Sequence, residues 1–331
     1  MTEQWTRDSV LELSAGFLKA RILLSAAELD LFTILGHKAS TVDELCRVKG
    51  WSPRALTILL DSLAAIGLVV KQPDGVYSVE DLAFRLLGSE GDESVLPMIL
   101  HRGRMWRTWS KLTDIVKQGS DPNRVDMEES PDEEVEAFIG AMQVIGRDTA
   151  ERIAGSIDLN GYKNMLDVGG GSGVYTAAFM NKAPQLKATI FDRPRVIEIA
   201  RERMTDAGLI DRVTLIEGDY NENELPLGHD LALLSAIVHI NGHEGNIELY
   251  RKIHRALRPG GTIMIRDYFL DESRTFPPEG AVFAVNMLVA TAAGNSYTME
   301  ETREALEAVG FKDAKLIRDE RFMEQVVCAV K

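Results

Sequence analysis

The stretch LDVGGGSG (residues 166–173) decides the fold, because it joins a short apolar run to a helical one through four glycines. The glycines let the main chain turn tightly and approach a ligand without interference from Cβ atoms. Reading G-x-G-x-x-G from Gly169 places Val174 at the third glycine position, so the spacing does not fit a dinucleotide loop. A P-loop is excluded as well, because the stretch contains no lysine.

Short apolar runs alternate with helical ones from about residue 161 onward. Examples are KNMLDVGGG followed by GVYTAAFMNKA, LKATIFD followed by VIEIARERMTDAG, and HDLALLSAIVH followed by EGNIELYRKIHRAL. An RPGG turn, the strand TIMIRDYFL, the helix TMEETREALEAVG and two final strands complete the pattern. This alternation predicts an α/β, Rossmann-like domain with a mainly parallel sheet, in which ligands bind at the carboxyl ends of the strands.

The N-terminal part is mainly α-helical and follows a winged-helix pattern. SVLELSAGFLKARILLSAAELDLFTIL has apolar residues on nearly all sides, as expected of a helix pair buried against a partner. Ser40 or Thr41 can cap the next helix, and Ser52 with Pro53 begins another that ends at Gly67. LVVKQPDGVYSV then alternates around Pro-Asp-Gly, which predicts a β-hairpin.

A winged helix can read DNA, but the residues of this one favour packing or dimerisation. Its second helix, residues 53–66, offers Arg54 as its only cation, and Asp61 opposes that charge. A helix that reads a groove needs more donors for phosphates and base edges. We therefore expect no nucleic-acid partner.

The net charge of −14, from 37 Lys and Arg against 51 Asp and Glu, is unevenly distributed over the 331 residues. Residues 1–117 hold 14 basic and 15 acidic side chains, whereas the rest of the chain holds 23 and 36. An acidic balance disfavours a general nucleic-acid or anionic-membrane binder. The polar, acidic stretch at residues 118–134 predicts an exposed connection between two domains.

The number of cysteines and the lengths of the apolar runs indicate the cellular compartment in which we expect the protein. Cys46 and Cys328 are too few for a disulfide framework or a four-cysteine zinc site, and no spacing of histidines and acids suggests another metal. The beginning MTEQWTRDSV lacks the pattern of a signal peptide, and the apolar runs are shorter than a membrane span. We therefore expect a soluble, cytoplasmic protein with reduced thiols and neither metal nor membrane contact.

Three aspartates stand at or near the ends of successive strands. Asp167 opens the pattern Asp-x-Gly-x-Gly-x-Gly, which resembles the first motif of S-adenosylmethionine-dependent methyltransferases. That cofactor has no phosphates but carries a cationic sulfonium, so an acid beside the loop is favourable. Asp192 is placed to accept hydrogen bonds from ribose hydroxyls, and Asp219 to accept one from the adenine amino group. Each could instead be a solvated acid at a strand end.

His239 closes an apolar run at the carboxyl end of a later strand, on the same ligand edge. A histidine in such a place can be a hydrogen-bonded structural residue. At a methyl-transfer site it can also act as a base, because a phenol with a pKa near 10 is mostly protonated at neutral pH and a histidine can accept its proton. His243 is a second possible acceptor, although a solvent-exposed histidine at a helix start fits it better.

Over nearly its whole length the chain resembles the small-molecule O-methyltransferases that include plant caffeate-type and bacterial polyketide-tailoring enzymes. The stretches that carry the resemblance are MWRTWSKLTDIVKQG, FIGAMQ, LDVGGGSG, FDRPRVI, GDY and LRPGGTIMI. The resemblance implies methyl transfer from S-adenosyl-L-methionine to a hydroxyl of a small, aromatic or polycyclic molecule, without metal. It also implies three parts: a winged-helix homodimerisation domain at 1–117, a linker and connecting helix at 118–160, and a Rossmann-like catalytic domain at 161–331.

The family pattern also assigns residues. It places the cofactor on Asp167, Gly169, Gly171, Asp192, Asp219 and Tyr220. It makes His239 the base, with Asp267 beside it, and it lines the acceptor pocket with Phe138, Met142, Asn286 and Met287.

This chain departs from the family at several positions. Residues 240–243 replace the usual Asp-Trp-x-Asp, Ser296 stands where a second acid flanks the histidine, and Ser235 stands where the plant enzymes have lysine. Two alternatives therefore stay open. One is methylation of carbon, nitrogen or sulfur, or a non-methylating use of the same cofactor. The other is a ligand-sensing winged-helix regulator.

Overall fold

The computed structural model describes residues 5–122, 124–125, 130–320 and 323–331. It divides into two compact units, Met1–Arg107 and Thr108–Lys331. The three-part division at 1–117, 118–160 and 161–331 stays a prediction. Residues 1–4 of the N-terminal stretch, and residues 123 and 126–129 of the expected connection, lie outside the described residues. None of the described helices is long and apolar enough to cross a membrane.

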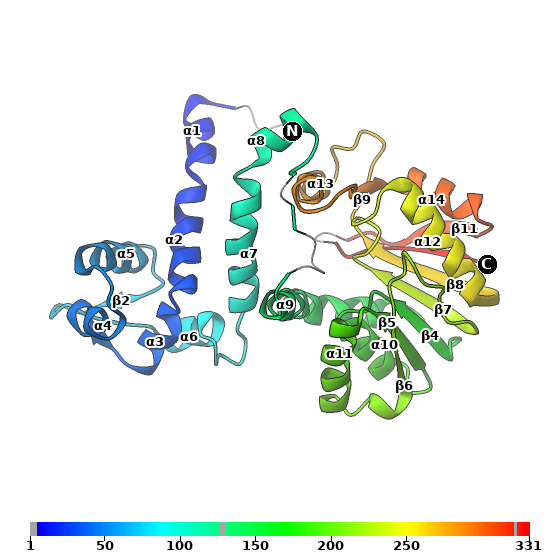
Figure 1. Ribbon diagram of the computed structural model, residues 1–331, viewed down its shortest axis with the longest axis horizontal. Helices are drawn as coiled ribbons and strands as arrows, with labels where there is room; N and C mark the ends of the chain where they lie inside the picture. The colour runs from blue at the N-terminus through cyan, green and yellow to red at the C-terminus, as the bar shows by residue number, and fades with distance from the viewer. Residues whose placement is uncertain (1–4, 123, 126–129, 321–322) are drawn as a thin grey trace. The chain divides into compact units, whose positions relative to one another are not determined.

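The first unit has the winged-helix arrangement that its sequence predicts (Figure 1). Thr41 caps one helix through a reciprocal pair of bonds with Glu44, and Ser52 caps the next, which begins at Pro53. The three short strands pair in the order β1-β3-β2. The elements of this unit are α1 (Arg7–Ala15), α2 (Phe17–Glu28), α3 (Leu31–His37), β1 (Ser40–Thr41), α4 (Val42–Lys49), α5 (Pro53–Ala65), β2 (Val70–Lys71), β3 (Val76–Ser78), α6 (Asp81–Leu87) and most of α7 (Leu96–Trp109).

The N-terminal apolar stretch forms three helices rather than the expected pair. Gly16 separates α1 from α2, and Asp30, in the left-handed region at φ 55°, separates α2 from α3. α1 buries none of its residues, while α2 buries Leu24, Ala26 and Ala27. The apolar side chains of α1 are therefore left on the surface of a single chain.

The second unit is built on a seven-stranded sheet in the order β11-β12-β8-β7-β4-β5-β6. The run from β8 to β6 is parallel, and the last two strands are antiparallel. The strands are β4 (Asn164–Val168), β5 (Lys187–Asp192), β6 (Val213–Glu217), β7 (His229–Ser235), β8 (Leu257–Asp267), β11 (Lys312–Arg318) and β12 (Gln325–Val330), with a separate pair β9 (Phe269–Leu270) and β10 (Tyr297–Thr298). The prediction of a Rossmann-like sheet is confirmed.

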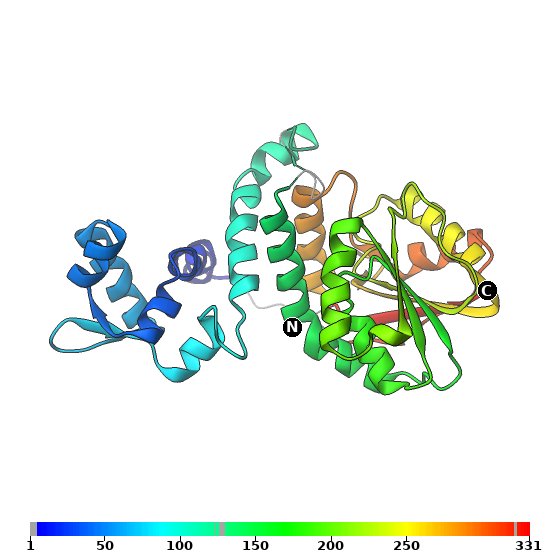
Figure 2. The ribbon, with the colours of Figure 1, turned by 60° about the horizontal axis from the view of Figure 1, so that its bottom comes forward.

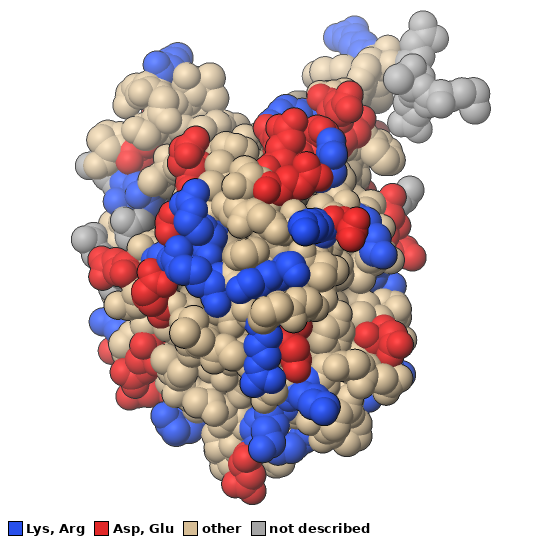
Figure 3. Space-filling model, turned by 90° about the vertical axis from the view of Figure 1, so that its right-hand side faces the viewer, with Lys and Arg blue, Asp and Glu red and all other residues tan. Residues whose placement is uncertain are grey.

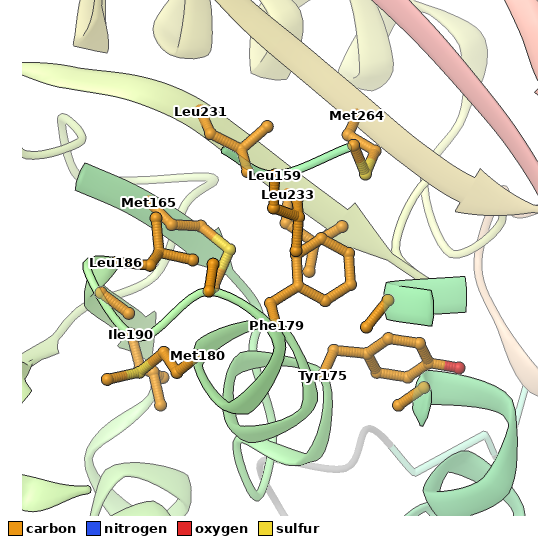
Figure 4. Packing of buried hydrophobic residues seen from close by; sticks show 14 of the residues in the cluster. Leu159, Met165, Tyr175, Phe179, Met180, Leu186, Ile190, Leu231, Leu233 and Met264 are labelled. Carbon is orange, nitrogen blue, oxygen red and sulfur yellow. The ribbon is translucent and has the colours of Figure 1, made fainter. Parts of the chain in front are cut away.

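Helices cover both faces of this sheet (Figure 1 and Figure 2). They are α9 (Asp132–Ser156), α10 (Val174–Lys182) and α11 (Pro194–Asp206) on one face, and α12 (His243–Ala256) and α14 (Met299–Ala308) on the other. The unit also contains α8 (Leu112–Gln118), α13 (Pro278–Ala290), which packs against β9, and a 3₁₀ turn at Ile210–Arg212. Alternate strand residues serve opposite faces, as a pleated strand requires. Met165 packs with α9, α10 and α11, while Leu166 packs with α12 and α14. Figure 4 shows Phe179 of α10 at the centre of the first cluster.

The RPGG segment is not the free turn that the sequence predicts. It lies inside β8, where the pairing with β7 shifts register between His229 and Leu231. Gly260 adopts φ 78°, which a residue with a Cβ rarely adopts. The irregularity therefore occurs within the strand, at its amino end and away from the ligand edge.

Acidic and basic side chains are interspersed on the face of the molecule shown in Figure 3. Many charged side chains of the protein are paired, for example Arg255 with Glu224 and Arg303 with Glu307. The excess of negative charge does not gather there into one acidic patch. Exposed pairs of this kind stabilise a fold only slightly.

Lys252 of α12 holds the acidic loop between β6 and β7. The residue is 6% exposed. Its ammonium donates to the carbonyl oxygens of Tyr220, Asn221 and Asn223, at 2.7, 3.1 and 2.9 Å. Three main-chain acceptors thus satisfy one buried cation. This fixes the segment that begins with Asp219 at the carboxyl edge of the sheet.

Lys252→Met should release this loop, because three carbonyls would lose their donor. We expect the free energy of unfolding to fall by about 1–3 kcal/mol. We also expect faster hydrogen exchange of the loop amides, residues 219–224, measured by mass spectrometry. Arg251→Met, which removes an exposed cation one residue away, is the control. Equal exchange in the two variants would contradict the role of Lys252.

Candidate active site

The glycine loop connects the carboxyl end of β4 to α10 with three residues in the left-handed region. Gly169, Gly171 and Gly173 have φ of 68°, 59° and 78°. The main-chain N–H of Gly171 donates to the Asp192 carboxylate at 2.8 Å. Gly169 N–H also donates to Phe191 O at 2.8 Å, so two hydrogen bonds tie the loop to the end of the neighbouring strand β5.

The space around the loop fits a ligand that approaches its backbone. A Cβ at Gly169 would lie 2.4 Å from the Ile237 side chain, and one at Gly170 would lie 2.9 Å from the Asp167 carboxyl carbon. A Cβ at Gly171 would meet no described atom within 4 Å. The loop thus packs against the domain at its beginning and is open at its middle residue.

Asp167 is a buried carboxylate with one oxygen left unused. It is 1% exposed, and its Oδ2 accepts a hydrogen bond from Thr176 Oγ1 at 2.6 Å. Its Oδ1 has no hydrogen-bond partner among the described residues. Burial raises the pKa of this carboxyl to about 7. A cationic ligand group could satisfy Oδ1 and stabilise the ionised form.

Asp192 and Asp219 meet at the ends of β5 and β6. Asp192 accepts from the N–H groups of Gly171 and Arg193, and burial raises the pKa of its carboxyl. The Arg193 guanidinium donates to Asp219 at 3.3 Å. The structure therefore brings together two of the carboxylates that the sequence analysis singled out.

Tyr220 follows Asp219 and lies beside the glycine loop. Its ring comes within 4.0 Å of the Cβ position at Gly169, and its hydroxyl donates to Asn241 Oδ1 at 3.3 Å. Burial raises the pKa of its phenol to about 12. The sequence-predicted cofactor residues thus share one edge of the sheet.

His239 is held by Asp267 at the next pair of strand ends. Its Nδ1 lies 2.8 and 2.9 Å from the two carboxylate oxygens, and its main-chain N–H donates to the same carboxylate at 3.3 Å. The imidazole is 7% exposed and Asp267 is fully buried. Because the acid occupies Nδ1, Nε2 is the nitrogen that remains to accept a proton, and no described residue forms a hydrogen bond with it.

Among the other described candidate residues around His239, none forms a hydrogen bond with the imidazole, and two contact the main-chain carbonyl instead. Ser296 donates to Gly280 O rather than to the imidazole, so Asp267 is the acid that orients the ring. Asn295 N donates to His239 O at 3.0 Å, and a Cβ at Gly294 would lie 2.3 Å from that same oxygen. His243 is exposed at the start of α12.

α13 places an aromatic ring beside the imidazole and carries an amide one turn further along. Phe283 meets the His239 ring edge to face, with centroids 4.8 Å apart, and also contacts Tyr268 at 5.1 Å. Three residues further along the helix, Asn286 Oδ1 accepts from Trp109 Nε1 at 3.0 Å. Sequence reasoning missed Phe283 and the partner of Asn286, although Trp109 lay within one of the stretches it quoted.

The other three residues expected to line the acceptor pocket differ in burial and in the helices that they contact. Met287 is 6% exposed and belongs to the interior. Met142 is half-buried on α9, and Phe138 packs beside Val196 of α11. Among the described residues, no three His, Cys, Asp or Glu side chains group as metal ligands would.

Comparisons with known proteins agree with this geometry. Residues 109–312 match the family model of the O-methyltransferase domain, and residues 11–89 match that of the O-methyltransferase dimerisation domain. The tetracenomycin polyketide synthesis 8-O-methyl transferase of Streptomyces glaucescens is 30% identical, over 92% of this chain and 91% of the relative. The 3-hydroxy-5-methyl-1-naphthoate 3-O-methyltransferase of Streptomyces sahachiroi is also 30% identical, over 93% and 90%.

Solved structures show the same fold. Human N-acetylserotonin methyltransferase, determined in complex with S-adenosylmethionine, superposes with a TM-score of 0.85 at 25% identity, over 100% of this chain and 99% of that one. The mitomycin 7-O-methyltransferase MmcR gives 0.83 at 26% identity, over 98% and 97%. With a glycine loop, strand-end acids and a histidine–aspartate pair on one sheet edge, and with both family models matched, this chain belongs to the O-methyltransferase family.

Proposed function

We propose that this O-methyltransferase transfers the methyl group of S-adenosylmethionine to a hydroxyl of a small aromatic or polycyclic molecule, with His239 as the general base. The observation that carries the proposal is the imidazole whose Nδ1 is engaged by both oxygens of the buried Asp267. That arrangement leaves Nε2 as a proton acceptor at the ligand edge of the sheet.

Asp267 acts through the orientation of the imidazole. Its carboxylate accepts a hydrogen bond from the Nδ1–H group. This fixes the tautomer that has a free lone pair on Nε2. When the ring takes a proton from the acceptor hydroxyl, the same carboxylate stabilises the imidazolium. The Phe283 ring excludes water from one side of this pair, and a drier surrounding strengthens their interaction.

Three carboxylates and the glycine loop bind the cofactor in this proposal. Asp192 accepts from the ribose hydroxyls, Asp219 from the adenine amino group, and Asp167 faces the ammonium of the methionine moiety. Gly169, Gly171 and Tyr220 complete the contact surface for the cofactor. When bound, S-adenosylmethionine supplies a methyl group made electrophilic by the sulfonium. The protein contributes the position of the acceptor oxygen and the removal of its proton.

The aromatic side chains and the oriented amide support an aromatic acceptor. Phe283 and Tyr268 offer ring faces or edges to a flat molecule. The Trp109 indole can only donate, so the Asn286 oxygen must face it and the Asn286 NH₂ is left to donate to an oxygen of the acceptor. A hydroxyl flanked by a carbonyl or a second hydroxyl fits this pair of groups. Two relatives are named for methylation in tetracenomycin polyketide synthesis and of a hydroxynaphthoate, which supports a polycyclic aromatic acceptor.

We also propose that the N-terminal unit mediates a homodimer. The part of the chain that matches the dimerisation domain begins within α1. Trp5, Leu11, Leu13, Phe17 and Leu18, from α1, α2 and the residues before them, are each more than half exposed. An apolar surface of this size needs a partner, and a second copy of the chain is the one that the family match supports.

His239→Ala should lower kcat about 10²- to 10⁴-fold on an acceptor identified by mass spectrometry from a panel of hydroxylated naphthoates and anthraquinones. Its affinity for S-adenosylmethionine, measured by calorimetry, should stay within about twofold. Asp267→Asn should lower kcat by a smaller factor. His243→Ala, which removes the exposed histidine four residues away, is the control. Full turnover by His239→Ala would show that positioning alone suffices.

Cofactor binding should strengthen with pH between about 5 and 7 because of Asp167. Burial holds its pKa near 7 in the free protein, so below that pH the carboxyl is neutral and must lose its proton to face a cation. The affinity should rise by up to about tenfold per pH unit. In Asp167→Asn, which keeps an oxygen to accept from Thr176, the slope should vanish. Parallel calorimetric pH profiles for the two proteins would refute the assignment.

Light scattering should give the purified protein twice the 36.7 kDa of one chain. The double variant Leu13→Asp, Phe17→Asp should be monomeric, because it places charges on the proposed interface. Leu82→Asp changes an exposed leucine of α6 and should remain dimeric. A wild-type monomer at tens of micromolar would overturn this proposal.

A further inference from the structure

Arg266 is a buried cation near the carboxyl end of β8, inside the seven-stranded sheet. It lies on β8, between β7 and β12, and is 8% exposed. Its Nε donates to Met323 O at 2.7 Å, and its Nη1 reaches Ser235 Oγ at 3.4 Å. No carboxylate in the described part of the chain forms an ion pair with it. Glu324, which follows Met323, is paired instead with Arg152 and Arg318.

Tyr175 offers an unused donor next to this guanidinium. It is the second residue of α10, directly after the glycine loop, and its ring centroid lies 5.0 Å from Arg266 Cζ. Its hydroxyl is buried and forms no hydrogen bond of acceptable geometry with a described residue, although the Ser235 hydroxyl is near enough to offset part of the effect of burial on the pKa of the phenol. Figure 4 shows this hydroxyl directed away from Phe179 and the hydrophobic cluster. Burial raises the pKa of the phenol, so the hydroxyl keeps its proton and can donate.

These groups lie close to the cofactor edge. Ser235 is the last residue of β7, whose neighbour β4 leads into the glycine loop. Arg266 stands opposite Ser235 in the β7–β8 pairing, so the two side chains point to the same face of the sheet. That face is the one covered by α10, which carries Tyr175. Three hydrogen-bond donors, one of them charged, therefore lie together on one face of the sheet, below the helix that follows the loop.

The proposed cofactor site still needs a group that binds a carboxylate. Asp167, Asp192 and Asp219 match the ammonium, the ribose hydroxyls and the adenine amine, but the methionine moiety also carries a carboxylate that none of them can accept. Lys252, the other buried Lys or Arg among the described residues of this unit, already donates to three carbonyls. A buried guanidinium without an anion is costly, and a carboxylate ligand would remove that cost.

We propose that Arg266, with the hydroxyls of Tyr175 and Ser235, binds the carboxylate of S-adenosylmethionine. In this chain the charge would come from the neighbouring strand β8 rather than from position 235, where the plant enzymes of the family carry lysine. The inference rests on S-adenosylmethionine as the methyl donor. It adds a recognition group to that site, and the site then matches both charges of the methionine moiety.

The test compares S-adenosylmethionine with its decarboxylated analogue, which keeps the adenosine, the sulfonium and the amine. Calorimetry on the wild-type protein should show a preference of about 10- to 100-fold for the complete cofactor. Arg266→Met should lose most of that preference while it binds the analogue within about threefold of wild type. Arg152→Met removes a cation already paired with Glu324 and should keep the full preference.

Two further variants keep the outcome decisive if Arg266→Met folds poorly. Tyr175→Phe removes only the unpartnered hydroxyl, so it should raise the melting temperature of the free protein by roughly 2–4 °C. The same variant should weaken binding of the complete cofactor several-fold without changing that of the analogue. Ser235→Lys in the Arg266→Met background should restore the preference, because Ser235 Oγ lies 3.4 Å from the nitrogen that is removed.

The result that overturns the inference is equal weakening of both ligands in Arg266→Met, which would reduce Arg266 to a support for the Met323 segment. An unchanged preference in Arg266→Met and Tyr175→Phe would overturn it as well. Failure of the wild-type protein to bind either ligand would instead refute the cofactor assignment, so the two ideas fail in different ways.

Discussion

The site depends on one constraint: the carboxyl ends of five parallel strands meet at the same edge of the sheet. The order β8-β7-β4-β5-β6 puts the glycine loop in the centre of that edge, with acids on one side and the histidine–aspartate pair on the other. The hydrogen bond from Gly171 to Asp192 fixes the loop against β5, and the bond from His239 to Asp267 joins the ends of β7 and β8. The roles proposed for the three aspartates, His239 and Asp267 follow from which strand end carries which side chain.

Burial at this edge leaves polar groups unsatisfied in the free protein. Among the described residues, Asp167 has an oxygen without a hydrogen-bond partner, Tyr175 has a hydroxyl without one, and Arg266 forms no ion pair with a carboxylate. Each of these costs stability, because a buried polar group loses its water and gains nothing in return. A zwitterionic ligand can satisfy all three at once. In the proposed cofactor site, the stability lost in the free state is recovered as binding strength and selectivity in the bound state.

The sequence predicted the parts of the fold that local patterns determine. Asp192 and Asp219 could be found because each closes an apolar run just before a turn, and the glycine loop because its four glycines follow a strand. The number of N-terminal helices could not be found this way, since Gly16 and Asp30 interrupt a continuous apolar pattern without changing its period. The RPGG segment has the composition of a turn, yet tertiary pairing extends β8 through it.

Contacts between distant segments were beyond reach for a different reason. Trp109 and Asn286 are 177 positions apart, and no local signal connects an indole on α7 with an amide on α13. Lys252 sits among exposed charges on its own helix, and only the loop packed over it shows that it is buried. In these cases the residue type shows whether a side chain can donate or accept a hydrogen bond, but it does not show which distant residue is the partner.

Arg266 and Asp267 show what the topology adds to such a reading. In the sequence they are two adjacent opposite charges near the end of a strand, the usual appearance of an exposed strand end. Because β8 lies inside the sheet and both faces are covered, neither reaches solvent, and the pleat sends them in opposite directions. Asp267 turns to His239, where an anion stabilises the imidazolium. Arg266 turns to the face beside the glycine loop, where a cation suits a carboxylate. The same pair of adjacent residues can thus serve the proton acceptor and the cofactor, each on its own face of one strand.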